Sequence, residues 1–131
     1  MPEHRAVVRA RQYVDLLHRG DFESMRHFYA DDVVWHVGGR HKLSGVYRGI
    51  DAVFDYFAQV RVLTGGTLRL EPHSILASDA QTVMFTRVTA RREGRGLDVE
   101  LVEILRMTPD GRWTEYFGMP SDGAAVGNFW D

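Results

Sequence analysis

The 131-residue sequence contains no cysteine. A disulfide framework, a thiolate metal site and a cysteine nucleophile are therefore excluded. The chain also lacks a charge excess, because 16 Lys and Arg face 18 Asp and Glu, and a net charge of −2 provides no basic surface for nucleic acid or an anionic membrane. No apolar run approaches the length of a membrane span, and the N-terminus has no signal-peptide core. We expect a cytoplasmic protein that binds neither nucleic acid nor membrane.

Several enzyme motifs are missing as well. The sequence has no G-x-S-x-G element, no Gly-rich phosphate loop and no dinucleotide fingerprint. His36 and His41 are separated by the flexible pair Gly38-Gly39, and no third metal ligand is evident. We therefore expect neither a metal ion nor a cofactor.

The length suits a single domain, 1–131. Apolar residues at helical spacing predict a helix over 5–19 that ends at Gly20, a short second helix over 22–29 capped by Asp21, and a third opened by Asp51. A strand is expected within 30–39, followed by a loop over 40–49. Four further strands are predicted from alternation and turn signals, at 67–77, 81–92, 97–108 and 112–119. Short turns between them indicate an antiparallel meander, and the grouped helices indicate an α+β fold.

Two glutamates interrupt the apolar faces of the last two predicted strands. In LDVELVEILRM, alternation places on one side Leu97, Val99, Leu101, Glu103, Leu105 and Met107. In the next strand the matching side holds Trp113, Glu115, Phe117 and Met119. Since a tight turn joins the two strands, both carboxylates are predicted to reach one interior.

Burying a carboxylate is costly unless it is paired, hydrogen-bonded or protonated. One interpretation is a pocket whose apolar walls raise a glutamate's affinity for its proton, so that it acts as a general acid or donates to a developing oxyanion. The other is structural: an arginine such as Arg69, Arg87 or Arg106 satisfies the two glutamates, or they lie at an open rim. Two such residues on adjacent strands favour the functional pocket.

Three other side chains are candidates for chemistry. Tyr13 lies on or beside the apolar stripe of the first helix, where a core role is the alternative. His36 alternates away from its apolar neighbours but is a common type of acid–base residue near neutral pH. Arg87 faces inward only if Val83, Phe85, Arg87 and Thr89 form the inner face of 81–92, and the competing face is Met84, Thr86, Val88 and Ala90.

Several phrases together resemble the nuclear transport factor 2-like (NTF2-like) superfamily, and most of all its SnoaL-like proteins, which include polyketide cyclases and relatives of ketosteroid isomerase. The phrases are GDFESMRHFYADDVVWHVGG, LSGVYRGIDAVFDYF, GLDVELVEILRMTPDGRWTEYF and the terminal FW. The resemblance implies a cone in which three N-terminal helices pack on a strongly curved, mostly antiparallel sheet that encloses a pocket. It also implies a homodimer formed through the outer face of the sheet.

The resemblance also implies residue roles. Ketosteroid isomerase builds an oxyanion hole from a tyrosine and a protonated acid, and Tyr13 and Glu103 stand at similar places here, whereas Val37 stands where the isomerase has its base. Limonene-epoxide-hydrolase-like relatives use two acids and an arginine. Glu115 and Arg87 match part of that set, and Thr89 replaces the second acid.

We expect cofactor-free acid–base catalysis on a mostly apolar, oxygenated small molecule, by cyclisation, isomerisation or epoxide opening. The predicted catalytic set is Glu103, Glu115, Tyr13, Arg87 and His36. The predicted pocket lining is Trp35, Val37, Phe54, Phe57, Leu101, Leu105, Phe117 and Met119, with Phe129 and Trp130 as a lid or plug. The alternatives are a protein that binds the molecule without turnover and a dimerisation module whose interior is filled by its own side chains.

Overall fold

The computed structural model describes residues 3–131 and has four α-helices and six strands. In chain order the elements are α1 (Arg5–Arg19), α2 (Phe22–Met25), a 3-10 turn (Arg26–Phe28), β1 (Tyr29–Val37), β2 (Gly45–Arg48), α3 (Ile50–Leu63), β3 (Arg69–Ala77), β4 (Gln81–Arg92), β5 (Arg95–Met107), β6 (Trp113–Pro120) and α4 (Gly123–Trp130). The α+β class is confirmed. Among these residues no helix is long and apolar enough to cross a membrane.

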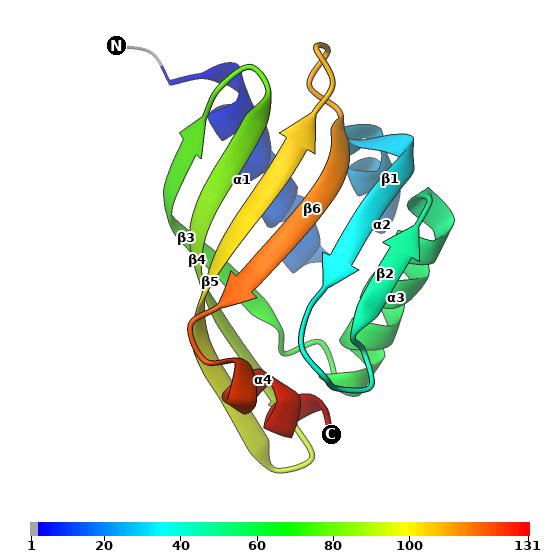
Figure 1. The fold of residues 1–131 in the computed structure, drawn as a ribbon, viewed down its shortest axis with the longest axis vertical. Coiled ribbons are helices and arrows are strands. Elements are labelled where there is room, and N and C mark those ends of the chain that lie inside the picture. The colour runs from blue at the N-terminus through cyan, green and yellow to red at the C-terminus, as the bar shows by residue number, and fades with distance from the viewer. Residues whose placement is uncertain (1–2) are drawn as a thin grey trace.

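The strands form one mixed sheet in the order β2-β1-β6-β5-β4-β3. The predicted meander from β3 to β6 is confirmed as antiparallel, and only β1 and β6 run parallel. Figure 1 shows α1 and α3 behind the sheet and α4 across its lower end. The sheet is not strongly curled, so the strong curvature implied by the resemblance is wrong.

The helix boundaries follow from local chemistry. Gly20 ends α1 in the left-handed conformation (φ 70°), and its N–H donates to the carbonyls of Leu16 and Leu17. Asp21 caps α2 by accepting from the Ser24 N–H. The third helix begins at Ile50 with Gly49 as its cap, slightly earlier than the predicted start at Asp51.

Two elements were not predicted. The short edge strand β2 lies in the stretch expected to be a loop, where it pairs with β1 from Val34 to Val37. The C-terminal tail forms α4, capped by Asp122 through the Ala125 N–H. Its last aromatic residues, Phe129 and Trp130, are buried, so the expectation that they tie down the chain end is confirmed.

An extra residue in β6 changes which side chains face the helices. Trp113 pairs with Met107 and Glu115 with Arg106, so β6 advances two residues while β5 advances one. This bulge at Thr114 interrupts the alternation, and Trp113 and Tyr116 both face inward. The predicted inward position of Glu115, Phe117 and Met119 is therefore wrong, because the alternation was extended through the bulge.

Candidate functional site

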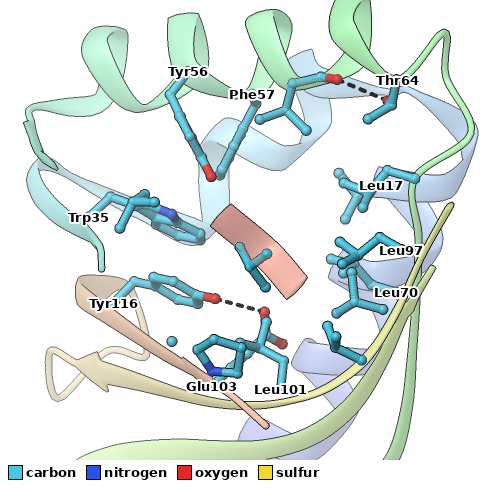
Figure 2. Close-up of a pocket in the computed structure, with 18 of the residues that line it drawn as sticks. Leu17, Trp35, Tyr56, Phe57, Thr64, Leu70, Leu97, Leu101, Glu103 and Tyr116 are labelled. Atoms are coloured by element: carbon cyan, nitrogen blue, oxygen red, sulfur yellow. Dashed lines mark hydrogen bonds between the residues drawn. The ribbon is translucent and has the colours of Figure 1, made fainter. Parts of the chain in front are cut away.

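A cavity of about 400 Å³ lies between the helices and the inner face of the sheet. Its lining includes four aromatic rings, two from α3 (Tyr56 and Phe57) and two from the sheet (Trp35 and Tyr116), and aliphatic side chains that include Leu17, Leu70, Leu97 and Leu101 (Figure 2). Val126 and Trp130 of α4 close one end. Such a largely apolar hollow with a few polar groups is typical of small-molecule sites.

Glu103 is the acidic side chain of this cavity. It follows the alternation predicted for β5 and is 5% exposed. Its Oε1 accepts a hydrogen bond from the Tyr116 hydroxyl at 3.0 Å, and its Oε2 accepts one from Thr86 Oγ1 at 3.1 Å. Both partners are neutral, and no Lys, Arg or His among residues 3–131 forms an ion pair with this carboxyl group.

Burial raises the pKa of Glu103, and the two hydroxyl donors oppose that rise in part because they stabilise the ionised form. The carboxyl group therefore keeps its proton to higher pH than an exposed glutamate. In its neutral form it donates a hydrogen bond, and in its ionised form it accepts a proton. Both functions are those of a general acid–base group held in an apolar site.

The Tyr116 hydroxyl is held in place by its surroundings. The ring stacks on Trp35 with centroids 3.7 Å apart and an interplanar angle of 6°. A Cβ atom at position 118 would lie 2.6 Å from the Tyr116 hydroxyl oxygen. Gly118 therefore leaves the space that this hydroxyl occupies when it reaches Glu103.

Tyr13 also lines the cavity, but it is bonded elsewhere. Its hydroxyl forms a hydrogen bond with that of Tyr29, and the structure gives it no bond to Glu103. Burial raises the pKa of Tyr13, so this group is a neutral hydroxyl at physiological pH. The structure thus brings Tyr13 and Glu103 to one cavity without joining them directly.

Three of the residues predicted to be catalytic hold their functional groups outside the cavity. On the outer face of the sheet, His36 Nε2 lies 2.8 Å from Glu115 Oε2, and the imidazole stacks on Phe117. The Arg87 guanidinium donates to both oxygens of Asp98, at 3.0 and 2.7 Å. Glu115 therefore lies on the outer face, contrary to its predicted inward position, and the shared interior predicted for the two glutamates is not formed. His36 lies on the outer face, as its alternation predicted, and Arg87 takes the outward one of its two alternative positions.

The question left open for strand 81–92 is settled by burial. Met84, Thr86, Val88 and Ala90 are buried, which is the second of the two alternative faces. Arg87 faces outward for the same reason, since it lies between two inward-facing neighbours.

Six of the ten residues predicted to line or close a pocket border this cavity. Trp35, Val37, Phe57, Leu101, Leu105 and Trp130 border the cavity. Phe54 instead packs against Phe22 and Tyr29 in the core, and Phe129 is buried in a second cluster beneath α4. The β6 bulge turns Phe117 and Met119 to the outer face, where Met119 is 53% exposed.

Two cavity residues, Tyr116 and Tyr56, were missed, and so was Thr86, which bonds to Glu103. Tyr116 was assigned to the wrong face because the bulge at Thr114 carries no clear signal in the sequence. Thr86 was named only as part of an alternative face, with no role. Tyr56 lies three residues after Val53 and four before Val60, so helical spacing could have placed it on the inner stripe.

The helix that closes one end of the cavity is anchored by two arginines. Arg92 donates from a buried position to the Phe129 carbonyl at 3.1 Å, and Arg95 donates to the Asn128 carbonyl at 2.9 Å. Both bonds satisfy carbonyl groups at the C-terminal end of α4, where positive charge is favourable. Trp130 therefore forms part of a fixed cavity wall, and Phe129 packs in the adjoining core cluster.

No three His, Asp or Glu side chains of residues 3–131 gather closely enough to hold a metal ion, so we assign no ligand set.

Comparison with known proteins places this geometry in a family. Residues 10–116 match the SnoaL-like domain, and the fold is shared with NTF2-like proteins. The uncharacterized protein Rv0034 of Mycobacterium tuberculosis is 33% identical over 113 residues, 86% of each chain. Bal32a, from a soil-derived mobile gene cassette, has a TM-score of 0.91 at 25% identity over 96% of each chain. A Shewanella denitrificans protein assigned as a SnoaL-like polyketide cyclase has a TM-score of 0.76 at 15% identity over 97% of each chain. The chain belongs to the SnoaL-like family.

Proposed function

We propose that this protein is a cofactor-free enzyme that uses Glu103 for acid–base catalysis on a mostly apolar, oxygenated small molecule of the polyketide type. The observation that carries the proposal is a buried carboxyl group in a small-molecule cavity, held by Tyr116 and Thr86 and free of any cationic partner among the described residues. A carboxyl group without such a partner keeps its proton more readily than one in an ion pair.

The proposed chemistry uses the neutral form of Glu103 first. Glu103 donates its proton to a carbonyl oxygen of the bound molecule, which makes the hydrogens on the neighbouring carbon more acidic. The resulting carboxylate is stabilised by the Tyr116 and Thr86 hydroxyls and can recover a proton from another position of the molecule. Such a sequence suits isomerisation or cyclisation through an enol.

Epoxide opening by a paired acid and arginine has less support. Arg87 and Glu115, the residues that would serve it, form separate pairs with Asp98 and His36 on the outer face. Membership of the SnoaL-like family and the fold shared with the Shewanella protein are consistent with cyclase chemistry, although the fold itself hosts many functions.

The alternative is a protein that binds the same kind of molecule without turnover. One observation favours it: both carboxylate oxygens of Glu103 are already hydrogen-bonded, and Val37 lines the cavity where the isomerase-like base was expected. In that case Glu103 would orient a ligand. A rate that depends on the ionisation of one buried carboxyl group supports catalysis, whereas an affinity change alone supports binding.

We propose in addition that the protein is a homodimer formed through the outer face of the sheet. Cross-strand pairing brings Phe85 beside Val102, which in turn pairs with Met119, and Ile104 beside Phe117. Phe85 and Met119 are among the exposed large apolar residues. An apolar row of this kind on one sheet face is typical of a surface covered by a partner.

The experiment compares Glu103→Gln with Glu115→Gln in a turnover screen of polyketide-type β-ketoacyl and phenolic compounds. Removing an acid–base group typically lowers a rate by about 10²- to 10⁴-fold. Glu103→Gln should show this loss, and Glu115→Gln, which changes the same side chain on the other face, should keep the wild-type rate. An active wild-type protein whose rate survives Glu103→Gln would overturn the assignment.

A further inference from the structure

The hydroxyl group of Tyr56 differs from those of the other four tyrosines. Tyr13 and Tyr29 bond to each other, Tyr47 donates to the Leu43 carbonyl at 2.7 Å, and Tyr116 donates to Glu103. Within residues 3–131 the structure gives the Tyr56 hydroxyl no hydrogen-bond partner. This oxygen is not among the fully buried atoms that lack a partner, so a water molecule or a ligand in the cavity can reach it.

The ring of Tyr56 is nevertheless fixed. It lies on α3 between Tyr47, with ring centroids 4.6 Å apart, and Phe57, with centroids 5.9 Å apart. Figure 2 shows the side chain reaching from α3 into the cavity, with Glu103 and Tyr116 on the opposite wall. A held ring with a free hydroxyl is suited to binding, because little conformational entropy is lost when a partner arrives.

The pKa of Tyr56 is consistent with a buried ring whose hydroxyl lies in the same cavity as Glu103. Burial is the main cause that raises the pKa of Tyr56, and the nearby hydroxyl of Tyr47 and carboxyl of Glu103 add to the rise. The group is therefore a neutral hydrogen-bond donor at all physiological pH values, and it is close enough to Glu103 to sense its charge.

We propose that Tyr56 is a ligand-binding residue and that it and Glu103 hold two oxygen functions of the same molecule from opposite walls of the cavity. The proposal rests on the site of the proposed function and names its substrate class. The ligand is a flat aromatic or conjugated compound with an oxygen at each of two edges. Its flat part lies among Trp35, Phe57 and Tyr116, and an aliphatic part extends toward the leucines.

The test uses two probes that differ by one hydroxyl group, 2-naphthol and 2,6-dihydroxynaphthalene, titrated calorimetrically into the wild-type protein and into Tyr56→Phe. The control is Tyr47→Phe, which removes a hydroxyl that bonds to the backbone and does not line the cavity. Loss of one neutral hydrogen bond typically weakens binding by about three- to tenfold. Tyr56→Phe should reduce the preference for the diol by that factor, and Tyr47→Phe should leave the preference unchanged.

The inference is overturned if the wild-type protein shows no preference for the diol, binds neither probe, or keeps its preference after Tyr56→Phe. Glu103→Gln separates this outcome from failure of the proposed function. If that change weakens both probes while Tyr56→Phe has no effect, Glu103 remains a ligand-binding group and only the role of Tyr56 is lost.

A second measurement needs no substitution. In protein labelled with carbon-13 at the tyrosine ring carbon that bears oxygen, the diol should shift the Tyr56 signal and leave the Tyr47 signal in place. An unmoved Tyr56 signal at saturating diol would contradict the inference even if the Tyr56→Phe protein failed to fold.

Discussion

Tyr116 on β6 donates a hydrogen bond to Glu103 on β5 across 3.0 Å, with both side chains buried on the inner face of the sheet. The two residues are not cross-strand partners, because Glu103 pairs with Gly118. The side chain of Tyr116 therefore extends over Gly118 to reach the carboxyl group, and three features of the chain combine in this contact: the bulge at Thr114, the absence of a side chain at position 118, and the stacking of Tyr116 on Trp35.

The first prediction concerns this hydrogen bond. Tyr116→Phe removes a donor that favours the ionised form of Glu103, so the pKa of Glu103 should rise above its wild-type value. Thr86→Val should act in the same direction through the other oxygen. The measurement is a carbon-13 NMR titration of the Glu103 carboxyl carbon in each variant. A pKa that falls, or stays the same in both, would show that these hydroxyls do not act on the carboxyl group.

A second prediction concerns stability and pH. The folded-state pKa of Glu103 is raised above the ordinary value of 4.5, so the folded protein binds this proton more tightly than the unfolded chain does. The resulting stability is present below pH 4.5 and is lost as the pH rises through the folded-state pKa. Each unit between the two pKa values corresponds to about 1.4 kcal/mol.

Glu103→Gln lacks this titration, so its free energy of unfolding relative to wild type should improve as the pH rises across that window. Urea unfolding of the two proteins at a series of pH values measures the difference. Glu115→Gln serves as the control, since Glu115 is partly exposed on the outer face. A wild-type protein that instead gains stability relative to Glu103→Gln with rising pH would contradict the raised pKa.

Gly118→Ala tests the space beside Tyr116. The new methyl group would lie 2.6 Å from the Tyr116 hydroxyl oxygen, so the ring must move or the strand must shift. We expect a loss of about 1–3 kcal/mol in the free energy of unfolding, as is typical of overpacking. Gly127→Ala is the matched control, because this helical glycine in α4 has open space around it and alanine should stabilise the helix by about 0.5–1 kcal/mol. Equal effects of the two substitutions would rule out a special role for Gly118.

The proposed dimer gives a fourth prediction. Phe85→Lys places a charge in the apolar row on the outer face, and the protein should then elute as a monomer in size-exclusion chromatography with light scattering. Val62→Lys is the control, since Val62 is 79% exposed on α3, away from that face. A wild-type protein that is monomeric, or a Phe85→Lys variant that remains dimeric, would contradict this interface.

Much of the fold follows from the sequence because its signals are local. The spacing in α1, its end at Gly20 and the cap at Asp21 require no knowledge of distant residues. Strand β5 alternates without interruption, so the inward position of Glu103 was predicted correctly. The order of most helices and strands was predicted from such local signals, and the resemblance to SnoaL-like proteins agrees with it.

The rest depends on contacts that a single strand does not specify. The bulge at Thr114 is defined by pairing with β5, and it determines that Tyr116, and not Glu115, accompanies Glu103. The face of β4 was ambiguous because both of its sides contain apolar residues, and only packing against the helices identifies Thr86 as the inward residue. The helix α4 was missed because its small residues give weak spacing, and it is held by bonds from distant arginines.

The most direct measurement is the carbon-13 NMR titration of the Glu103 carboxyl carbon in the wild-type protein. A buried acid without a cationic partner should titrate above the ordinary value of 4.5, and binding of an oxygenated aromatic probe should change its signal. A midpoint at or below 4.5 would mean that the carboxyl group is ionised like an exposed one, and the proposal that it serves as a proton donor in an apolar cavity would be wrong.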